Sequence, residues 1–280
     1  MLGFSFSLPA TRLAAPELGA VVVGLGRAVL ASIFAGALLW RVKAELPSRA
    51  QLLHLAVVAL GVVVGFPLLS ALALREVPAS HASVTIGVVP LLTAAIASLR
   101  AKERLPLSFW AASLVGAVLV AGYALTQSGG SFAEADLFLV GGVFLVALGY
   151  AEGARLAASM GGLRVVSWAL LIASPLCLLC VIINILQFGI TWPSAPALGG
   201  FLYVSCISMF LAFIAWYKGL ALAGVPRASQ LQLLQTPLSL LWSGLFLGEE
   251  VSPALLLVCV GALACAFMAQ RVRLSQKNRL

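Results

Sequence analysis

Three glutamines stand in a short, otherwise mostly apolar stretch of the chain, residues 230–244, which reads QLQLLQTPLSLLWSG. A carboxamide in hydrocarbon costs free energy unless a hydrogen bond satisfies it. Because successive residues of an α-helix turn by about 100°, Gln232, Gln235, Ser239 and Trp242 are predicted to share one helix face. Carboxamides offer both donors and an acceptor, which suit a zwitterionic amino acid, and an indole adds an apolar wall. We interpret this face as part of a substrate-binding cavity.

Polar side chains in membrane helices can also hold neighbouring helices together, at roughly 0.6–2 kcal/mol for each interaction. That structural role remains an alternative for Gln232 and Gln235, for which we favour the cavity. Gln230 stands near the start of the helix and is expected at the membrane interface.

A second helix, predicted over residues 79–99, carries His81 and Thr85 four residues apart on one face. Imidazole changes charge near neutral pH, so His81 could carry a coupling proton. A hydrogen-bonded structural histidine at the start of the helix is the alternative, and we favour it. Both residues remain cavity candidates.

Tyr150, Tyr203 and Arg27 are further candidates. The two tyrosines could supply aromatic surface to a cavity, although aromatic side chains also gather at membrane interfaces. Arg27 lies well inside an apolar run that begins at residue 18. Its guanidinium could snorkel to the membrane surface or bind a substrate carboxylate, and the sequence leaves both readings open. Glu152 and Arg155 are expected to form a snorkelling ion pair.

The composition indicates that these helices are surrounded by lipid. Of 280 residues, 62% are hydrophobic and only 9% are charged, and the mean hydropathy is +1.11. Soluble proteins carry about 25% charged residues, so this chain is predicted to be an all-α membrane protein. The formal charge of +8 sits in short gaps between apolar runs, which indicates topology rather than nucleic-acid binding.

Apolar runs of about 20 residues mark membrane-crossing helices. Nine such runs occur, and residues 1–15 are interpreted as part of a first helix that is incomplete or begins upstream, which gives ten spans. Most Lys and Arg residues lie in alternate gaps, so the positive-inside rule places both termini in the cytoplasm. The nine runs are 18–40, 50–73, 79–99, 107–126, 136–156, 163–186, 197–222, 228–247 and 253–270.

An internal repeat divides the chain. Pro90 and Pro237 are each followed 13 residues later by a glutamate, Glu103 or Glu250, and 16 residues later by another proline. VPASHAS and VPRASQL stand upstream of the two prolines. The glutamates are expected to cap helix N-termini, and the two mid-helix prolines are predicted to act as paired hinges.

These matches predict two five-helix units, residues 1–130 and 131–280. An odd number of spans in each unit gives the copies opposite orientations. Inverted repeats of this kind are typical of secondary transporters, which bind substrate between the halves. A duplicated scaffold of other purpose is the alternative.

The five-plus-five plan and the repeated proline–glutamate–proline spacing resemble the drug/metabolite transporter superfamily, EamA type. Within it, the chain is most similar to YddG-type aromatic amino-acid exporters. The resemblance implies a basket of ten helices around a central cavity, alternating access, and export of small metabolites across the inner membrane.

The sequence favours amino-acid export over three other functions. Sugar-phosphate or nucleotide-sugar exchange needs cations in the cavity, and the sequence is expected to place no Lys or Arg at mid-depth. A drug transporter of the same fold is a further alternative. A membrane enzyme is disfavoured because no HExxH, GxSxG or P-loop motif occurs. We therefore expect amino acids and membrane lipids as partners, no nucleic acid, no metal or cofactor, and a functional monomer.

Overall fold

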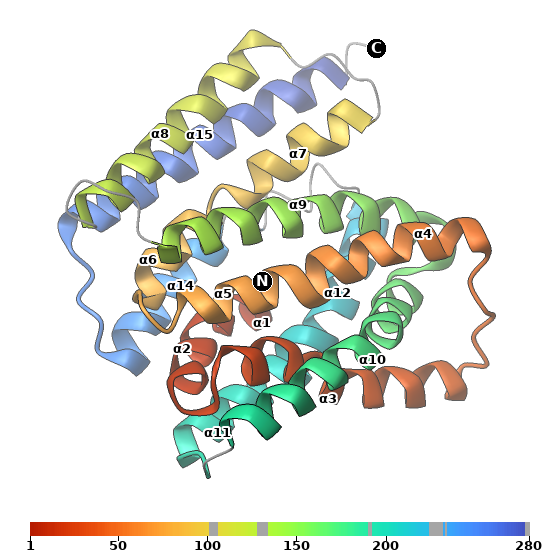
Figure 1. Cartoon of the computed structure of the whole chain (residues 1–280). Coiled ribbons are helices and arrows are strands. Elements are labelled where there is room, and N and C mark those ends of the chain that lie inside the picture. The colour runs from red at the N-terminus through yellow and green to blue at the C-terminus, as the bar shows by residue number, and fades with distance from the viewer. Residues whose placement is uncertain (101–105, 128–133, 190–191, 224–231, 233, 278–280) are drawn as a thin grey trace.

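The computed structural model describes residues 1–100, 106–127, 134–189, 192–223, 232 and 234–277. Within these ranges every regular element is a helix, and no strand occurs (Figure 1). Glu103 and Gln230 lie outside the described residues, as do Lys102, Arg104 and Arg227, which are among the basic residues of the alternate gaps.

The first part of the chain folds into helical segments that follow one another closely. Two of the connections between segments are single residues, Phe6 and Gly19. The segments are α1 (Leu2–Ser5), α2 (Ser7–Leu18), α3 (Ala20–Arg41), α4 (Arg49–Val58), η1 (Ala59–Gly65), α5 (Phe66–Ala73), α6 (Ala79–Ile86), α7 (Val89–Arg100) and α8 (Leu107–Gln127).

The second part repeats this pattern of long and interrupted helices. Its segments are α9 (Glu134–Met160), α10 (Gly162–Phe188), α11 (Ala195–Leu202), η2 (Tyr203–Leu211), α12 (Ala212–Ala223), α14 (Gln235–Leu247) and α15 (Pro253–Lys277). The terminal helices of the two parts, α8 and α15, lie side by side at one edge of the molecule (Figure 1).

Six helices of the described chain are long and apolar enough to cross a membrane. Their outward side chains are apolar too, as in α10, where Leu176, Leu179 and Ile183 are exposed. Together these features define a multi-pass membrane protein; the count of ten spans stays a prediction. The six are Ala20–Arg41, Arg49–Ala73, Ala79–Ala97, Glu134–Met160, Gly162–Phe188 and Ala195–Gly219, and shorter apolar helices cover Leu107–Gly116 and Pro253–Cys265.

The N-terminal residues, expected to be a fragment of one helix, form two short helices packed inside the molecule. Ala10 and Ala14 of α2 are fully buried. Gly200 of α11 allows this packing, because a Cβ there would lie 2.5 Å from the carbonyl oxygen of Ala10. The segment therefore contributes to the interior.

Two π-helical segments interrupt long helices, η1 between α4 and α5, and η2 between α11 and α12. At η1 the backbone lies directly against α9: a Cβ on Gly61 would be 2.3 Å from the carbonyl oxygen of Leu145 and 3.1 Å from the Cα atom of Gly149. Small residues that let helix backbones touch are the usual means of helix association in membranes. Segments of π-helix are rare and are often found at functional sites.

The two mid-helix prolines stand at helix breaks instead of within continuous bent helices. Gly87 and Val88 form a turn between α6 and α7, and Pro90 is the second residue of α7. Pro237 is the third residue of α14, directly after the turn at Leu234. Proline is well accommodated in the first turn of a helix, where its missing N–H costs no hydrogen bond.

Candidate substrate-binding cavity

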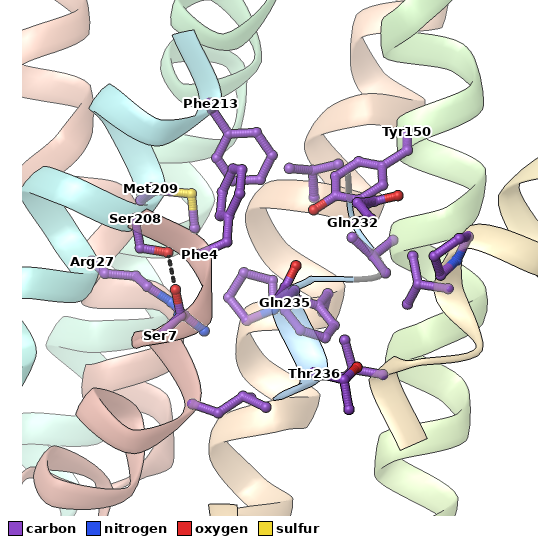
Figure 2. A pocket seen from close by; sticks show the side chains of 18 residues that line it. Phe4, Ser7, Arg27, Tyr150, Ser208, Met209, Phe213, Gln232, Gln235 and Thr236 are labelled. Atoms are coloured by element: carbon purple, nitrogen blue, oxygen red, sulfur yellow. Dashed lines mark hydrogen bonds between the residues drawn. The ribbon is translucent and has the colours of Figure 1, made fainter. Parts of the chain in front are cut away.

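A cavity lies at the centre of the molecule, between helices from both parts of the chain (Figure 2). Its walls come from α1, α2, α3, α5, α6 and α7 on one part, from α9, α12 and α14 on the other, and from both π-segments. The space open to water inside it is about 40 Å³, far below the ~300–1,000 Å³ of pockets that enclose drug-sized ligands. The cavity is therefore narrow and has room for a few water molecules.

Arg27 is the one charged residue among the described residues that line the cavity. It belongs to α3, and its side chain points toward Ser7 in Figure 2. The residue is only 3% exposed; Nε donates to the carbonyl oxygen of Gly24 at 3.3 Å, whereas Nη2 has no hydrogen-bond partner. The expectation that no cation lies at mid-depth is wrong, because a buried guanidinium faces the cavity.

Two serine hydroxyls close one wall of the cavity. Ser7 Oγ and Ser208 Oγ are 2.6 Å apart and join α2 to η2 (Figure 2). Neither serine was a sequence candidate, since single serines in apolar helices are common packing residues. Only the fold shows that they meet.

The amide groups come from Gln235, the first residue of α14, and from Gln232, three residues before that helix. Gln232 and Gln235 both line the cavity, and Gln232 Oε1 is buried without a hydrogen-bond partner. The neighbouring Thr236 also lines it and donates from Oγ1 to the carbonyl oxygen of Ser83 at 3.3 Å, which ties α14 to α6. The Gln232 carboxamide oxygen is thus an acceptor that the protein leaves unused.

An aromatic cluster forms a further part of the wall. Tyr150, Phe4 and Phe213 line the cavity, with the Phe4 and Phe213 rings edge to face at a centroid distance of 4.8 Å. Tyr150 contacts Phe213 and Trp216, each at 6.1 Å. Edge-to-face contacts of this kind stabilise aromatic clusters, so this wall is a fixed apolar surface.

Three sequence candidates instead hold α1 in place. Ser239 donates to the carbonyl oxygen of Ser5 at 2.6 Å, and Trp242 Nε1 donates to Ser5 Oγ at 2.9 Å. Tyr203 donates to the carbonyl oxygen of Gly3 at 3.3 Å. None of the three is among the described residues that line the cavity.

His81 forms a buried pair with a carboxylate. Its Nε2 lies 2.7 Å from Asp136 Oδ1, at the start of α9, and both residues are less than 9% exposed. The Tyr123 ring of α8 stacks obliquely on the imidazole at 6.0 Å. His81 and Thr85 are buried in α6 and are not among the described cavity-lining residues, whereas Pro90 is.

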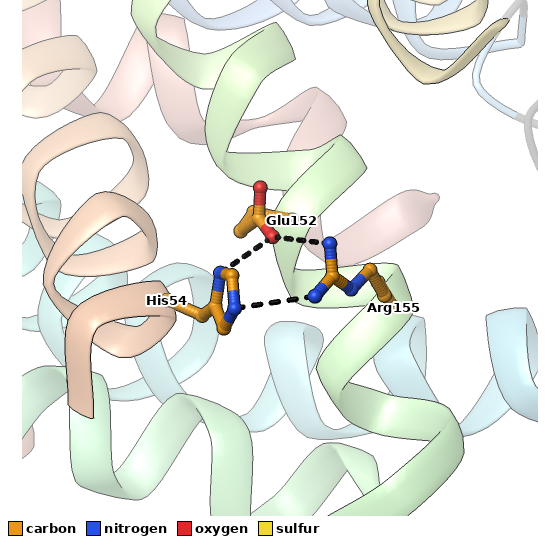
Figure 3. A network of polar contacts seen from close by, with 3 residues as sticks. All are labelled: His54, Glu152 and Arg155. Carbon is orange, nitrogen blue, oxygen red and sulfur yellow. Dashed lines mark hydrogen bonds and ion pairs between the residues drawn. The ribbon is translucent and has the colours of Figure 1, made fainter. Parts of the chain in front are cut away.

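The second histidine joins a polar cluster farther along α9 (Figure 3). His54 Nδ1 lies 2.9 Å from Glu152 Oε1, and Arg155 Nη2 lies 3.2 Å from His54 Nε2. A guanidinium only donates, so Nε2 accepts from Arg155, while Nδ1 faces the carboxylate at ion-pair distance. The expected ion pair is present, with Arg155 Nη1 3.7 Å from Glu152 Oε1. Arg155 reaches the surface, whereas Glu152 is 1% exposed and lies inside the protein.

No group of three or more potential metal ligands occurs among the described residues. Cys177 and Cys180, which form a C-x-x-C, are free thiols on α10. The described residues that line the central cavity offer hydrogen bonds, one positive charge and apolar contact.

Known proteins resemble the chain over nearly its whole length. Residues 1–125 and 133–270 both match the EamA-like transporter family. The sequence is 43% identical over 276 residues to a protein of Bacillus subtilis (strain 168) named "Uncharacterized transporter YdeK", covering 97% of this chain and 94% of the relative. A crystal structure shares the fold, with a TM-score of 0.63 and 19% identity over 96% of each chain.

Fold, cavity and relatives agree on a class: this is a multi-pass membrane transporter. More narrowly, the chain belongs to the EamA-like transporter family.

Proposed function

We propose that the protein exports neutral amino acids, aromatic ones among them, across the inner membrane by alternating access. The observation that carries the proposal is the central cavity, which combines two carboxamides, a hydroxyl pair and an aromatic wall between the two parts of the chain. A zwitterion with an apolar side chain requires polar groups on one side and apolar surface on the other.

Two inverted five-helix halves fit this mechanism. The family match falls twice on the chain, and each half interrupts a long helix with a π-segment, η1 in one and η2 in the other. Both π-segments reach the cavity, through Val62 and Met209. Carriers of this plan bind substrate between the halves and rock them to expose it alternately. The breaks beside Pro90 and Pro237 are where we place the hinges.

The cavity must enlarge to admit an amino acid. At about 40 Å³ of water-accessible space it holds a few waters, so substrate entry requires the surrounding helices to move apart. Both termini are placed in the cytoplasm by the distribution of Lys and Arg.

The test is transport by the purified protein in liposomes. Vesicles preloaded with unlabelled phenylalanine are diluted into labelled phenylalanine, threonine or methionine, with protein-free vesicles as the control. We expect exchange of at least phenylalanine above the control. Absence of uptake of all three, in either membrane orientation, would contradict amino-acid transport, and the same vesicles then test sugar phosphates and cationic drugs.

A further inference from the structure

We propose that Arg27 binds the carboxylate of the transported molecule and so makes the cavity selective for small monocarboxylates. The inference deepens the proposed function, because it names the group of the substrate that the cavity recognises. It depends on three observations: the depth of Arg27, its unsatisfied nitrogen, and the charge of its surroundings.

Arg27 lies too deep to reach the membrane surface. It is the eighth residue of α3, about 10 Å from the first residue at 1.5 Å per residue. At 3% exposure the side chain is enclosed by protein. Of the two readings left open by the sequence, the structure therefore excludes snorkelling.

The guanidinium has unused binding capacity. Nε donates to a backbone carbonyl of its own helix, and Nη2 is buried with no partner. An arginine remains charged at any physiological pH, and a buried charge without a partner costs several kcal/mol. A site that tolerates this cost in its empty form is built to receive an anion.

The surroundings set the charge of that anion. No Asp or Glu is among the described residues that line the cavity, and Arg27 is the one cationic residue among them. A carboxylate carries one negative charge and is neutralised by one guanidinium, which can hold both oxygens through parallel N–H bonds. A phosphate dianion would leave one charge uncompensated in the membrane interior.

Gln232 supplies the complementary group. Its buried Oε1 is an acceptor without a partner, on the side of Tyr150 and away from Arg27 in Figure 2. A ligand with a carboxylate at one end and an N–H or O–H donor elsewhere would satisfy both orphaned atoms. The apolar wall between them, with Phe4 and Phe213, fits a hydrocarbon or aromatic body.

Ligand-induced shifts in the thermal unfolding temperature (Tm) of the purified full-length protein test whether the cavity recognises a carboxylate, an amine or a phosphate. The probes are phenylalanine, 3-phenylpropanoate, phenethylamine and inorganic phosphate. We expect the two carboxylates to raise the Tm of the wild type, and the amine and phosphate to leave it unchanged. In Arg27→Gln the carboxylate affinity is expected to fall about 10- to 100-fold, the range for hydrogen bonds to a charged group. Arg27→Lys is expected to retain part of it.

Arg75→Gln is the matched control, since it removes the same charge from an exposed position between α5 and α6; its carboxylate response is expected to equal that of the wild type. Without ligand, Arg27→Gln should unfold at the wild-type temperature or above it, because the cation makes no ion pair. A lower Tm with unchanged carboxylate affinity would show a structural role and overturn the inference.

Two other results would also overturn it: stabilisation by phenethylamine but not by 3-phenylpropanoate, or an Arg27-dependent response to phosphate without one to carboxylates. The inference and the proposed function can fail separately. Arg27-dependent carboxylate binding without amino-acid transport in vesicles would refute the function and retain the site. Amino-acid transport that is unaffected in Arg27→Gln would support the proposed function and refute the carboxylate site at Arg27.

Discussion

At the scale of single residues, α14 separates two roles that its sequence does not distinguish. Gln235 lines the cavity at the start of the helix, whereas Ser239, one turn later, donates a hydrogen bond to the backbone of Ser5.

Gln235→Ala is expected to raise the KM for substrate about threefold to tenfold, the value of one hydrogen bond, with little change in Tm. Ser239→Ala should lower the Tm and leave KM unchanged. Vesicle transport and thermal unfolding of both variants check this; the reversed pattern would contradict it.

Helical periodicity predicted part of this arrangement. It placed Gln232, Gln235, Ser239 and Trp242 on one face, which assumes a continuous helix. In the structure α14 starts only at Gln235, after a turn at Leu234. The rotation of about 100° per residue therefore does not relate Gln232 to the other three residues. Arg27, Ser7 and Ser208 needed the fold itself, because their partners in the cavity come from distant segments. Its charge, well inside an apolar run, marked Arg27 as unusual in the sequence. No sequence rule could decide whether its guanidinium snorkels to the membrane surface or binds a substrate carboxylate.

At the scale of elements, α6 is capped from far along the chain. Both carboxylate oxygens of Glu249 accept hydrogen bonds, from the backbone N–H groups of Ala79 and Ser80, each at 2.8 Å. The sequence suggested that Glu250 caps the helix that follows it; the neighbouring acid instead caps a helix 170 residues earlier. The spacing of residues along the chain predicts that a helix boundary lies near these glutamates. It does not predict which distant helix packs its N-terminus against them.

The cap can be tested with adjacent acids. Glu249→Gln removes the charge that complements the N-terminus of α6, and is expected to cost about 1–2 kcal/mol of stability. Glu250 is exposed, so Glu250→Gln serves as the control and should leave the Tm unchanged. Equal Tm values for the two variants would argue against the cap.

The close approach of η1 and α9 makes a stronger prediction. Gly61→Ala would place a methyl group against the carbonyl of Leu145, and neither backbone can move without opening the interface beside the cavity. We expect poor folding and loss of transport. Gly199→Ala in α11 meets no atom within 4 Å and should be neutral or mildly stabilising, because alanine favours helix. Yield of monodisperse protein in detergent measures both.

At the scale of the whole molecule, the sequence was sufficient to predict the membrane class and the helical architecture, since both follow from the composition and from the length of the apolar runs.

The orientation of the chain in the membrane remains a prediction, which cysteine labelling in intact cells can decide. Arg75→Cys, in the α5–α6 connection, is expected to react with a membrane-impermeant thiol reagent added outside. Lys43→Cys, between α3 and α4, should react only after permeabilisation, and the wild type measures the background from native cysteines. The opposite labelling would place the termini outside.

Both histidines of the chain pair with acids of the same helix. His81 of α6 meets Asp136 near the start of α9, and His54 of α4 meets Glu152, sixteen residues later, about 24 Å along the axis. Each pair joins α9 to a helix of the first family match, at a different depth. Because the two pairs stand about 24 Å apart along α9, a tilt of that helix against α4 and α6 would stretch one pair more than the other.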